Sequence, residues 1–596
     1  MSGKTIVLVA SDSESSEYLR STWRQMLLAA LPARYAHYMG ADWSIKNQVK
    51  ADGQAAYVPH GLRIVESLLL KRFDPEHLAV CYPDELGQFV GEDTRAVGVH
   101  AHNPVGLTFA SDIYPALYGW GLEPINAAEF RRLILHPALR QHKSHLKIIV
   151  GGPGAWQIEK KHFQDEWGID CIVDGEAEDV ALPLFEAAVR GEPLPRKVKG
   201  HSPELENVPP VHHRSTFGTV EITRGCGRGC QFCSVALRGG KSIPLEQIVH
   251  NVGVQVAEGA DTVLLVTEDL FLYEQGPRFD TNVSALRRLF ESVAAVPGVK
   301  HIQLTHGTMA PVVCNPKAIV ELSDLAVSMS SDQHRASTHP EHRYQHMFIG
   351  LETGSVRLFK QYMKGKAYPY RPEQWPDVVL KGMETLNRQN WFPICTFILG
   401  LPGETREDTR HSLDLLFSLK DAKWCVIPTL FVPLEGTRLE KKQSANLIEM
   451  TDLQWEFFFT AWRYNADFWR GSEVRRQFNL GVPLYYYLLG RELFGKTIKY
   501  PLMRFGHFPE WLLRDRLYLN FGKGAIPPYR VPERVEIPPD RVSSWLAISR
   551  TWNPSETTRK ARIGTSPIAS GELLAEERTL DDVRSDRGTE LEGCSD

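Results

Sequence analysis

The sequence has no long apolar segment and no large excess of charge of one sign. Its 596 residues include 68 lysines and arginines against 72 aspartates and glutamates, which gives a formal net charge of −4. A chain this close to neutral gives no electrostatic reason to expect binding to nucleic acid or to an anionic membrane surface. No apolar run reaches the roughly 18 residues that a transmembrane helix requires. We therefore expect neither nucleic acid nor a membrane among its partners.

Cysteine is also scarce, with nine residues in the whole chain. The opening stretch "MSGKTIVLVASDSESSEYLRS" lacks the pattern of a signal peptide, so we expect a reducing, cytoplasmic setting and no disulfide framework. Most of the isolated cysteines lie in apolar, strand-like surroundings, which is typical of small buried side chains. These six are Cys81, Cys171, Cys314, Cys395, Cys425 and Cys594.

Residues 1–200 have the pattern of an α/β domain. Short apolar runs, separated by helical patterns, predict parallel strands at 5–10, 78–83, 96–101, 146–152 and 171–176. This alternation predicts a doubly wound, Rossmann-like fold, in which ligands bind beyond the carboxyl ends of the strands. The turns expected at that edge are "SDSES", "HAHNPVG", "VGGPGAWQ" and "DGEAED". Residues 201–217, rich in proline and histidine, are predicted to be a linker.

A second alternating pattern runs over residues 218–440. Strands are predicted at 219–224, 262–267, 301–307, 346–351, 393–400 and 424–432, with helical stripes between them. Six such units form a partial (β/α)6 barrel, whose catalytic groups gather at the carboxyl ends of the strands. Residues 327–347 interrupt the alternation with histidines of irregular spacing, which favours a solvated insertion over a metal site. The histidines are His334, His339, His342 and His346.

The residue composition changes again after residue 440. Residues 441–550 are rich in aromatic side chains at helical spacing, which predicts a mainly helical C-terminal domain that serves as core or lid. Residues 551–596 are polar and charged, so we expect them to be disordered.

Residues 222–235, "ITRGCGRGCQFCSV", place Cys226, Cys230 and Cys233 directly after the first barrel strand. Three thiolates on a four-iron cluster leave one iron open to a small molecule. The interleaved glycines let the backbone turn and approach sulfur. A zinc site would need a second cysteine pair, which is missing, and a redox-active CxxC would leave Cys226 unexplained. The spacing therefore favours a site-open 4Fe–4S cluster.

With Phe232 before its last cysteine, this loop resembles that of the radical S-adenosylmethionine (SAM) enzymes. "IGLETGSVRLFKQYMKG" (349–365) is similar to the fourth-strand motif of that superfamily, which implies that Glu352 and Ser355 lie near the adenosyl ribose. "FILGLPGETRED" (397–408), which contains Gly400, resembles the fifth-strand motif that lies against adenine. "FVPLEGTRL" (431–439) resembles the sixth strand and turn. The resemblance covers residues 218–435 and implies a 4Fe–4S cluster, SAM and an external reductant.

A doubly wound domain ahead of such a barrel resembles the cobalamin-binding subgroup of the superfamily. The chain lacks the Asp-x-His-x-x-Gly motif whose histidine ligates cobalt; its nearest match, Asp332-Gln333-His334, falls in the insertion. Cobalamin is therefore expected without that ligand, and a vestigial, nucleotide-free domain is the alternative. The residues that the resemblance assigns to cobalamin are His102, Asn103, Gly106, Gly151, Gly152, Gly154, Trp156, Gly175 and Glu176.

Over residues 1–530, length and layout resemble the tryptophan 2-C-methyltransferases of thiopeptide antibiotic biosynthesis. This implies a monomer that moves the methyl group of SAM, through methylcobalamin, to C2 of L-tryptophan. Glu268 would lie at the amino and carboxylate ends of SAM, where its carboxylate could block the open iron; alternatively, Glu268 or Asp269 accepts a hydrogen bond from the SAM ammonium. Arg63 would lie under the corrin and discourage a lower ligand, unless it is simply solvated. The base that removes the substrate proton is not identified.

Three other functions stay open, and a fourth is disfavoured. One is a radical, cobalamin-dependent methyltransferase acting on an sp3 carbon, a peptide or a phosphinate, with 5′-deoxyadenosine as its marker. Another is a tetrapyrrole-modifying enzyme of the same architecture. A transfer-RNA methylthiolase is disfavoured because it needs a second three-cysteine cluster upstream, where residues 1–200 hold only Cys81 and Cys171. The last is a non-catalytic cobalamin or iron–sulfur sensor.

Overall fold

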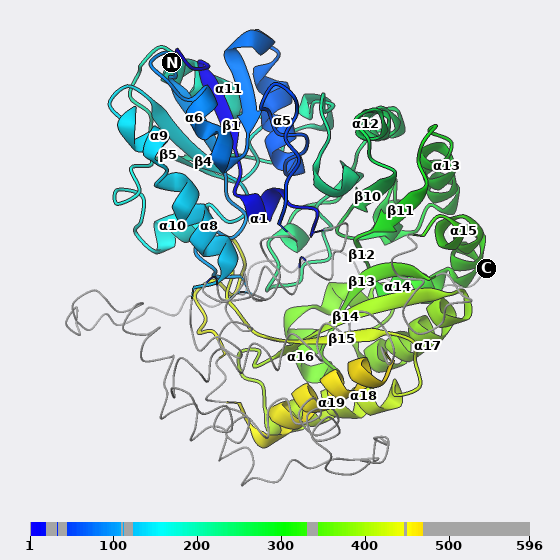
Figure 1. Cartoon of the computed structure of the whole chain (residues 1–596). Coiled ribbons are helices and arrows are strands. Elements are labelled where there is room, and N and C mark those ends of the chain that lie inside the picture. The colour runs from blue at the N-terminus through cyan, green and yellow to red at the C-terminus, as the bar shows by residue number, and fades with distance from the viewer. Residues whose placement is uncertain are drawn as a thin grey trace, which may run out of the picture.

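The computed structural model describes residues 2–18, 45–108, 123–330, 344–445 and 450–468, with the single residues 25, 33 and 111. Its N-terminal unit, blue to cyan in Figure 1, is built on one six-stranded parallel sheet in the order β2-β1-β3-β4-β5-β6. The order reverses between β1 and β3, which is the switch point where doubly wound sheets bind ligands. The strands are β1 (Ile6–Val9), β2 (Leu78–Cys81), β3 (Ala96–His100), β4 (Lys147–Gly151), β5 (Cys171–Asp174) and β6 (Lys197–Lys199).

Helices cover both faces of this sheet, so the strands other than the edge strand β6 are apolar on both faces. In β1, Val7 packs into one buried cluster with Phe130 of α8, while Leu8 packs into the other with Phe185 of α11. The continuous apolar runs of the sequence follow from this double burial. The helices are α1 (Asp12–Ser15), α5 (His60–Leu69), α6 (Leu86–Phe89), α8 (Ile125–Ile134), α9 (Pro137–Gln141), α10 (Trp156–Lys160) and α11 (Ala181–Val189).

The second unit is a curved wall of parallel strands. Two ladders, β7-β10-β11 and β12-β13-β14-β15, join because β11 and β12 are consecutive parts of one chain segment interrupted at Thr305. The wall therefore has the six positions expected of a partial (β/α)6 barrel. Its strands are β7 (Thr219–Glu221), β10 (Thr262–Val266), β11 (His301–Leu304), β12 (His306–Gly307), β13 (Gln345–Glu352), β14 (Trp391–Leu399) and β15 (Cys425–Leu430).

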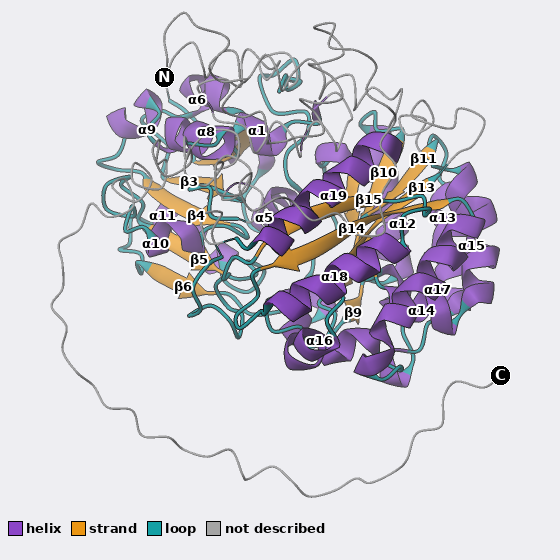
Figure 2. Ribbon diagram, turned by 90° about the horizontal axis from the view of Figure 1, so that it is seen from below, coloured by secondary structure: helices purple, strands orange, loops and turns teal. Residues whose placement is uncertain are grey.

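Helices alternate with these strands and lie along one side of the wall, as Figure 2 shows. The last described helix, α19, packs beside β15, where the Asn465 side chain bonds both the N–H and the carbonyl of Val426. The helices are α12 (Leu245–Ala257), α13 (Val283–Ala294), α14 (Met309–Cys314), α15 (Pro316–Ser328), α16 (Val356–Tyr362), α17 (Trp375–Arg388), α18 (Arg406–Ser418) and α19 (Asp452–Phe468). The α/β fold class is thus confirmed. No described helix combines the length and apolar character needed to cross a membrane.

Some expected elements differ from those observed. The strand expected at 219–224 is split, because Thr223–Arg224 (β8) leaves the barrel and pairs antiparallel with Lys241–Ser242 (β9). The expected linker carries two short 3-10 turns, Leu205–Asn207 and Thr216–Gly218. The histidines at 334, 339 and 342, the Asp332-Gln333-His334 string, and residues 469–596 lie outside the described residues. The aromatic-rich C-terminal domain is therefore described only up to the end of α19.

Candidate functional site

The cysteine loop, residues 225–240, leaves the barrel wall through the β8–β9 pair. Cys226 and Cys230 are buried, and Cys233 is half-buried. The glycines that separate the cysteines, Gly225, Gly227 and Gly229, have φ values of +72°, +73° and +75°. These values lie in the left-handed region, which glycine adopts without steric cost. The loop therefore turns where the sequence predicted that it would.

The environment of the cysteines fits a cationic cluster. Burial raises the pKa of the Cys226 thiol to about 11 and that of Cys230 to about 12. Cys233 also raises the pKa of both other thiols, and Cys226 raises that of Cys230, so the three sulfurs lie close enough to interact. Because metals bind the thiolate, iron must supply the positive charge that keeps these groups deprotonated. Three sulfurs on a glycine-rich loop are a donor set that suits a 4Fe–4S cluster with one open iron.

A buried lysine that sequence reasoning missed lies beside these sulfurs. Lys366 donates to Glu352 Oε1 at 2.7 Å, and both side chains are less than a tenth exposed. Burial opposes its charge, but Glu352 and Cys230 raise the pKa of Lys366 above its ordinary value. Glu352 has φ +67°, lies at a register shift of β13, and also accepts the Thr396 hydroxyl at 3.2 Å. Lys366 falls one residue beyond the recognised motif, so no spacing rule pointed to it.

Asp269 stabilises the cysteine loop. Arg228, between the first two cysteines, contacts Asp269 Oδ2 through Nη2 at 3.0 Å and through Nε at 3.1 Å. The Thr308 hydroxyl donates to the same oxygen at 2.7 Å, and the guanidinium lies over the Phe279 ring. The Asp269 carboxylate is therefore already engaged, and of the two acids considered for the SAM ammonium only Glu268 has a free oxygen.

Glu268 follows β10 and reaches the start of the cysteine loop. Its Oε2 is buried and has no hydrogen-bond partner among the described residues. Burial raises its pKa above the ordinary value, against the opposing effects of Arg238 and the Gly225 backbone. A buried carboxylate oxygen without a hydrogen-bond partner destabilises the folded state unless a ligand supplies the missing partner. Both roles expected for Glu268, blocking the iron and binding the ammonium, require such an oxygen.

Ser355 has a structural role in the described residues. Its side chain is fully buried and caps α16, where it accepts the Leu358 N–H at 3.3 Å and donates to Asp408 at 2.5 Å. These contacts occupy the hydroxyl, and the position beside the adenosyl ribose that the motif implied for Ser355 stays a prediction. Gly400 has φ +76° after β14 and donates its N–H to Glu404 Oε2 at 2.6 Å, so it shapes the turn of the fifth-strand motif. Phe232 is half-buried on the cysteine loop.

The predicted turns of the N-terminal unit meet at the switch point. Glu14, after β1, accepts the N–H groups of His102 and Asn103 at 2.9 and 3.2 Å and contacts His100 Nδ1 at 2.9 Å. The Asn103 amide oxygen accepts the Gln157 side chain at 3.1 Å. The loops after β1 and β3 are thereby joined to each other and to α10.

Glycines allow close approach between these loops. A Cβ on Gly154 would lie 2.0 Å from the His102 carbonyl oxygen, and one on Gly152 would lie 2.8 Å from that of Ala101. Gly106 has φ +74°, and Gly151 ends β4. Trp156 opens α10, half-buried, with the Lys160 ammonium over its ring. The residues assigned to cobalamin therefore share one edge.

The loop after β5 joins this edge to the cysteine loop. Gly175, with φ +113°, precedes Glu176, whose carboxylate pairs with Arg224 at 3.0 Å and with Arg238. Arg224 directly precedes the loop and also contacts Glu178 at 2.6 Å. The carboxyl edge of the N-terminal sheet thus faces the cysteine loop.

Arg63 is buried rather than solvated. It is 1% exposed, pairs with Glu66 at 2.8 Å, and donates to the carbonyls of Arg214 and Ala55 at 2.9 and 3.3 Å. The guanidinium ties α5 to the segment that leads into the barrel, and the role expected for Arg63 under a corrin stays a prediction.

Residues 220–416 match the model of the Radical SAM superfamily. Among curated proteins, the tRNA-2-methylthio-N(6)-dimethylallyladenosine synthase of Mannheimia succiniciproducens is 24% identical over 335 residues, covering 54% of this chain and 65% of the relative. That of Natranaerobius thermophilus is 24% identical over 287 residues, covering 47% and 58%. The chain thus spans less than two thirds of the length of these relatives.

Two solved structures are also similar. The radical SAM methyltransferase TsrM from Kitasatospora setae, with tryptophan and a SAM analogue bound, gives a TM-score of 0.48 at 14% identity, covering 73% of this chain and 75% of that one. The cobalamin-dependent SAM radical enzyme OxsB, with aqua-cobalamin and SAM bound, gives a TM-score of 0.49 at 13% identity, covering 95% and 82%.

The upstream cysteines do not form a second cluster site. Cys81 ends β2 and Cys171 begins β5, and β1, β3 and β4 lie between these strands. Their side chains also belong to buried clusters on opposite faces of the sheet. The cysteine loop at the first strand, the six-position parallel wall and the superfamily match agree that residues 220–416 of this chain are a radical SAM domain.

Proposed function

We propose that this protein is a cobalamin-dependent C-methyltransferase that uses SAM as methyl donor, with C2 of L-tryptophan as acceptor. One observation carries the proposal: the carboxyl edge of the N-terminal sheet faces the cysteine loop, joined to it by Glu176, Arg224 and Arg238. A cofactor at the sheet edge and SAM at the cysteine loop would therefore share one space.

The residues present fit both groups. Cys226, Cys230 and Cys233 would hold the cluster, and Lys366 would offset part of the negative charge of their thiolates. At the sheet edge, Ser15 Oγ and the amide oxygens of Asn47 and Asn126 are buried without a hydrogen-bond partner among the described residues. A corrin carries many amide side chains that both donate and accept, so orphaned groups of this kind suit its periphery. Cobalamin would supply a nucleophilic metal centre able to accept a methyl group from a sulfonium and pass it to carbon.

The protein's own residues would bind and orient the donor. Glu268 Oε2 would accept a hydrogen bond from the SAM ammonium or, closer to iron, prevent SAM from chelating it. Glu352, held by Lys366, lies at the carboxyl end of β13 on the same side of the barrel. The indole C2 is electron-rich, so it can attack a methyl group without prior loss of hydrogen.

Methylthiolation of transfer RNA is the second candidate, because the curated relatives carry that name. It requires a second cluster, and neither Cys81 nor Cys171 can share one with the other. We therefore favour methyl transfer. A radical methyltransferase acting on another carbon would use the same cofactors and differs in its by-product.

The test uses anaerobically reconstituted protein with methyl-labelled SAM, cobalamin, a reductant and free tryptophan. Mass spectrometry follows labelled 2-methyltryptophan and 5′-deoxyadenosine in the same samples. Cys233→Ala should abolish both products, whereas Cys314→Ala, outside the cysteine loop on α14, should retain activity.

Labelled 2-methyltryptophan without 5′-deoxyadenosine would support polar methyl transfer and the blocking role of Glu268. Accumulation of 5′-deoxyadenosine without methylated tryptophan would refute tryptophan as substrate and indicate a radical methyltransferase. Neither product from a cluster-loaded protein that binds SAM would refute the catalytic proposal and favour a sensor.

A further inference from the structure

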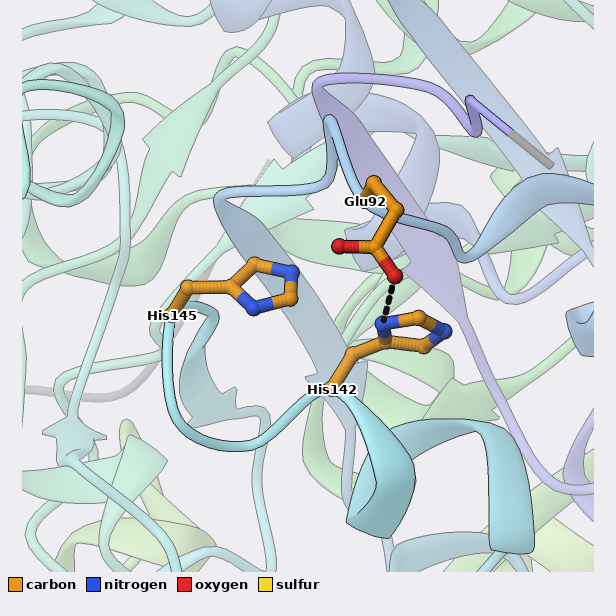
Figure 3. A group of neighbouring side chains, drawn as sticks. All are labelled: Glu92, His142 and His145. Atoms are coloured by element: carbon orange, nitrogen blue, oxygen red, sulfur yellow. Dashed lines mark ion pairs between the residues drawn. The ribbon is translucent and has the colours of Figure 1, made fainter.

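A group of potential metal ligands lies at the edge of the N-terminal sheet opposite the proposed cofactor edge. Glu92 precedes β3, while His142 and His145 precede β4, and these strands are parallel neighbours. Their amino ends therefore bring the three side chains together (Figure 3), and one ligand atom from each of them lies within 4.8 Å of the other two.

The geometry suits a small divalent cation. Glu92 Oε1 lies 3.8 Å from His142 Nδ1, and the two imidazole rings are 5.4 Å apart at 70°. In a tetrahedral zinc site with bonds of about 2.0–2.1 Å, neighbouring donor atoms are about 3.4 Å apart. Closing the group on a metal therefore needs only small side-chain rotations. The Glu92 side chain is 76% exposed and free to make them.

The backbone fixes both histidines. His142 follows the last residue of α9, and its carbonyl accepts the N–H groups of His145 and Leu146 at 3.2 Å each. This turn holds His142 and His145 on one side of the sheet edge, and the His142 side chain is only 11% exposed. A hydrogen-bonded turn just before β4 therefore holds the two histidines of the His-x-x-His sequence.

Within the described part of the chain, the two imidazoles have no strong competing hydrogen-bond partner. Among the described residues, the polar contacts of these rings are long: 3.8 Å from His142 Nδ1 to Glu92 and 3.4 Å from His145 Nε2 to the Gly91 carbonyl. Good hydrogen bonds of this type are about 2.7–3.2 Å. Two weakly bonded imidazoles and one carboxylate are a donor set that favours zinc-class ions over magnesium or calcium.

We propose that Glu92, His142 and His145 bind one zinc-class divalent ion, with water completing its coordination. The ion would join the loop before β3 to the turn before β4 and stabilise this edge of the sheet. It would take no part in chemistry at the opposite edge, so the site is independent of the proposed methyl transfer.

The test uses the full chain with its iron–sulfur cluster loaded, so that the loop cysteines do not compete for zinc. After equilibrium dialysis against micromolar Zn²⁺, inductively coupled plasma mass spectrometry should find one zinc per chain. His142→Gln and His145→Gln should each lower the affinity at least about tenfold, because even loss of a partner behind a ligand costs about 10–100-fold. His201→Gln, a change at an exposed histidine far along the chain, should leave zinc content unchanged.

Zinc should also raise the melting temperature of the wild-type chain but not that of His145→Gln, which gives a readout independent of stoichiometry. Binding only at millimolar zinc, or equal zinc content in wild type and His145→Gln, would overturn the proposal. If a histidine variant fails to fold, Glu92→Gln, at an exposed side chain, replaces it and should also weaken binding.

Discussion

Replacing Arg224 by glutamine should loosen the junction between the N-terminal unit and the cysteine loop. The Arg224 side chain is 14% exposed and contacts three carboxylates: Glu178 at 2.6 Å, Glu176 at 3.0 Å and Glu221 at 2.7 Å. Burial lowers the pKa of Arg224, but the carboxylates of Glu221 and Glu178 raise it above its ordinary value. Burial raises the pKa of Glu221 to about 6, against the opposing effect of Arg224. Without the guanidinium, little positive charge would remain to offset the mutual repulsion of the three carboxylates.

The expected loss follows from the burial of this group. Removing one partner of a buried ion pair costs about 3–5 kcal/mol, because the charge left behind is not resolvated. Glu178 is 3% exposed, whereas Glu176 and Glu221 are 18% and 19% exposed, so we expect the lower end of that range. A loss of about 3 kcal/mol corresponds to roughly a hundredfold increase in local opening.

Hydrogen exchange followed by mass spectrometry measures this opening directly, without assuming that the whole chain unfolds in one step. Peptides covering β8, β9 and residues 175–178 should exchange about a hundredfold faster in Arg224→Gln, whereas α17 peptides should be unchanged. Arg288→Gln breaks an exposed pair with Glu274 and is the matched control, with no change expected at these peptides. In Arg224→Gln/Glu178→Gln, part of the protection should return because one uncompensated charge is gone. Unchanged exchange in Arg224→Gln, or strictly additive effects in the double variant, would refute the reasoning.

Four further variants test other features of the site. Lys366→Met leaves the buried Glu352 without its ion-pair partner, so it should lower the free energy of unfolding by about 3–5 kcal/mol and lower the iron content. Lys360→Met, at an exposed lysine, is the control and should change neither. Thermal melting measures the stability and an iron assay measures the content; equal iron content in Lys366→Met and wild type would contradict the prediction. Gly225→Ala would place a Cβ 2.6 Å from the Gly239 carbonyl oxygen, whereas a Cβ at Gly229 would have no atom within 4 Å. Gly225→Ala should therefore reduce cluster loading more than Gly229→Ala. Equal loading of the two variants would show that the close contact is unimportant. Glu268→Gln should permit 5′-deoxyadenosine formation if the carboxylate blocks the open iron, and a product profile identical to wild type would exclude that role. Burial raises the pKa of Glu129 from 4.5 to about 7, so its contribution to stability is complete below pH 4.5 and is lost as pH rises through about 7. Glu129→Gln should therefore flatten the fall in unfolding free energy between about pH 5 and 7, on the order of 3 kcal/mol by urea titration, and an unchanged slope would refute the assignment.

Much of the fold could be predicted because a strand buried on both faces has a continuous apolar run in its sequence. The run at 5–10 became β1 at Ile6–Val9, and the runs at 96–101 and 146–152 became β3 and β4 with ends shifted by one residue. The short edge strand β6 was missed, because its Lys-Val-Lys sequence has neither length nor an apolar run. The strand at 219–224 was predicted as one piece, since nothing in its composition marks where the backbone changes partner.

The site was predicted where chemistry is local and missed where it depends on tertiary contacts. Cysteine spacing and glycine content identified the loop, and the positive φ values confirm its turns. Ser355 and Arg63 were assigned roles from their positions alone, but a hydroxyl at a helix start and a guanidinium beside open carbonyls find protein partners first. Lys366 could not be found from the sequence, since its meeting with Glu352 depends on how the chain returns across the barrel end.

The entry and exit of the cysteine loop also bear on how the protein matures. The loop begins and ends at the two-residue β8–β9 pair, whereas β7 is anchored separately to β10 in the barrel wall. Opening β8–β9 would free both ends of the loop while β7 stays paired with β10, and the contacts of Arg228 with Asp269 and of Arg238 with Glu176 would also have to break before the cysteines are exposed. Because the pairing of β7 with β10 does not involve the loop, we expect the barrel wall to form without the cluster, so that iron and sulfide can be delivered to the loop afterwards.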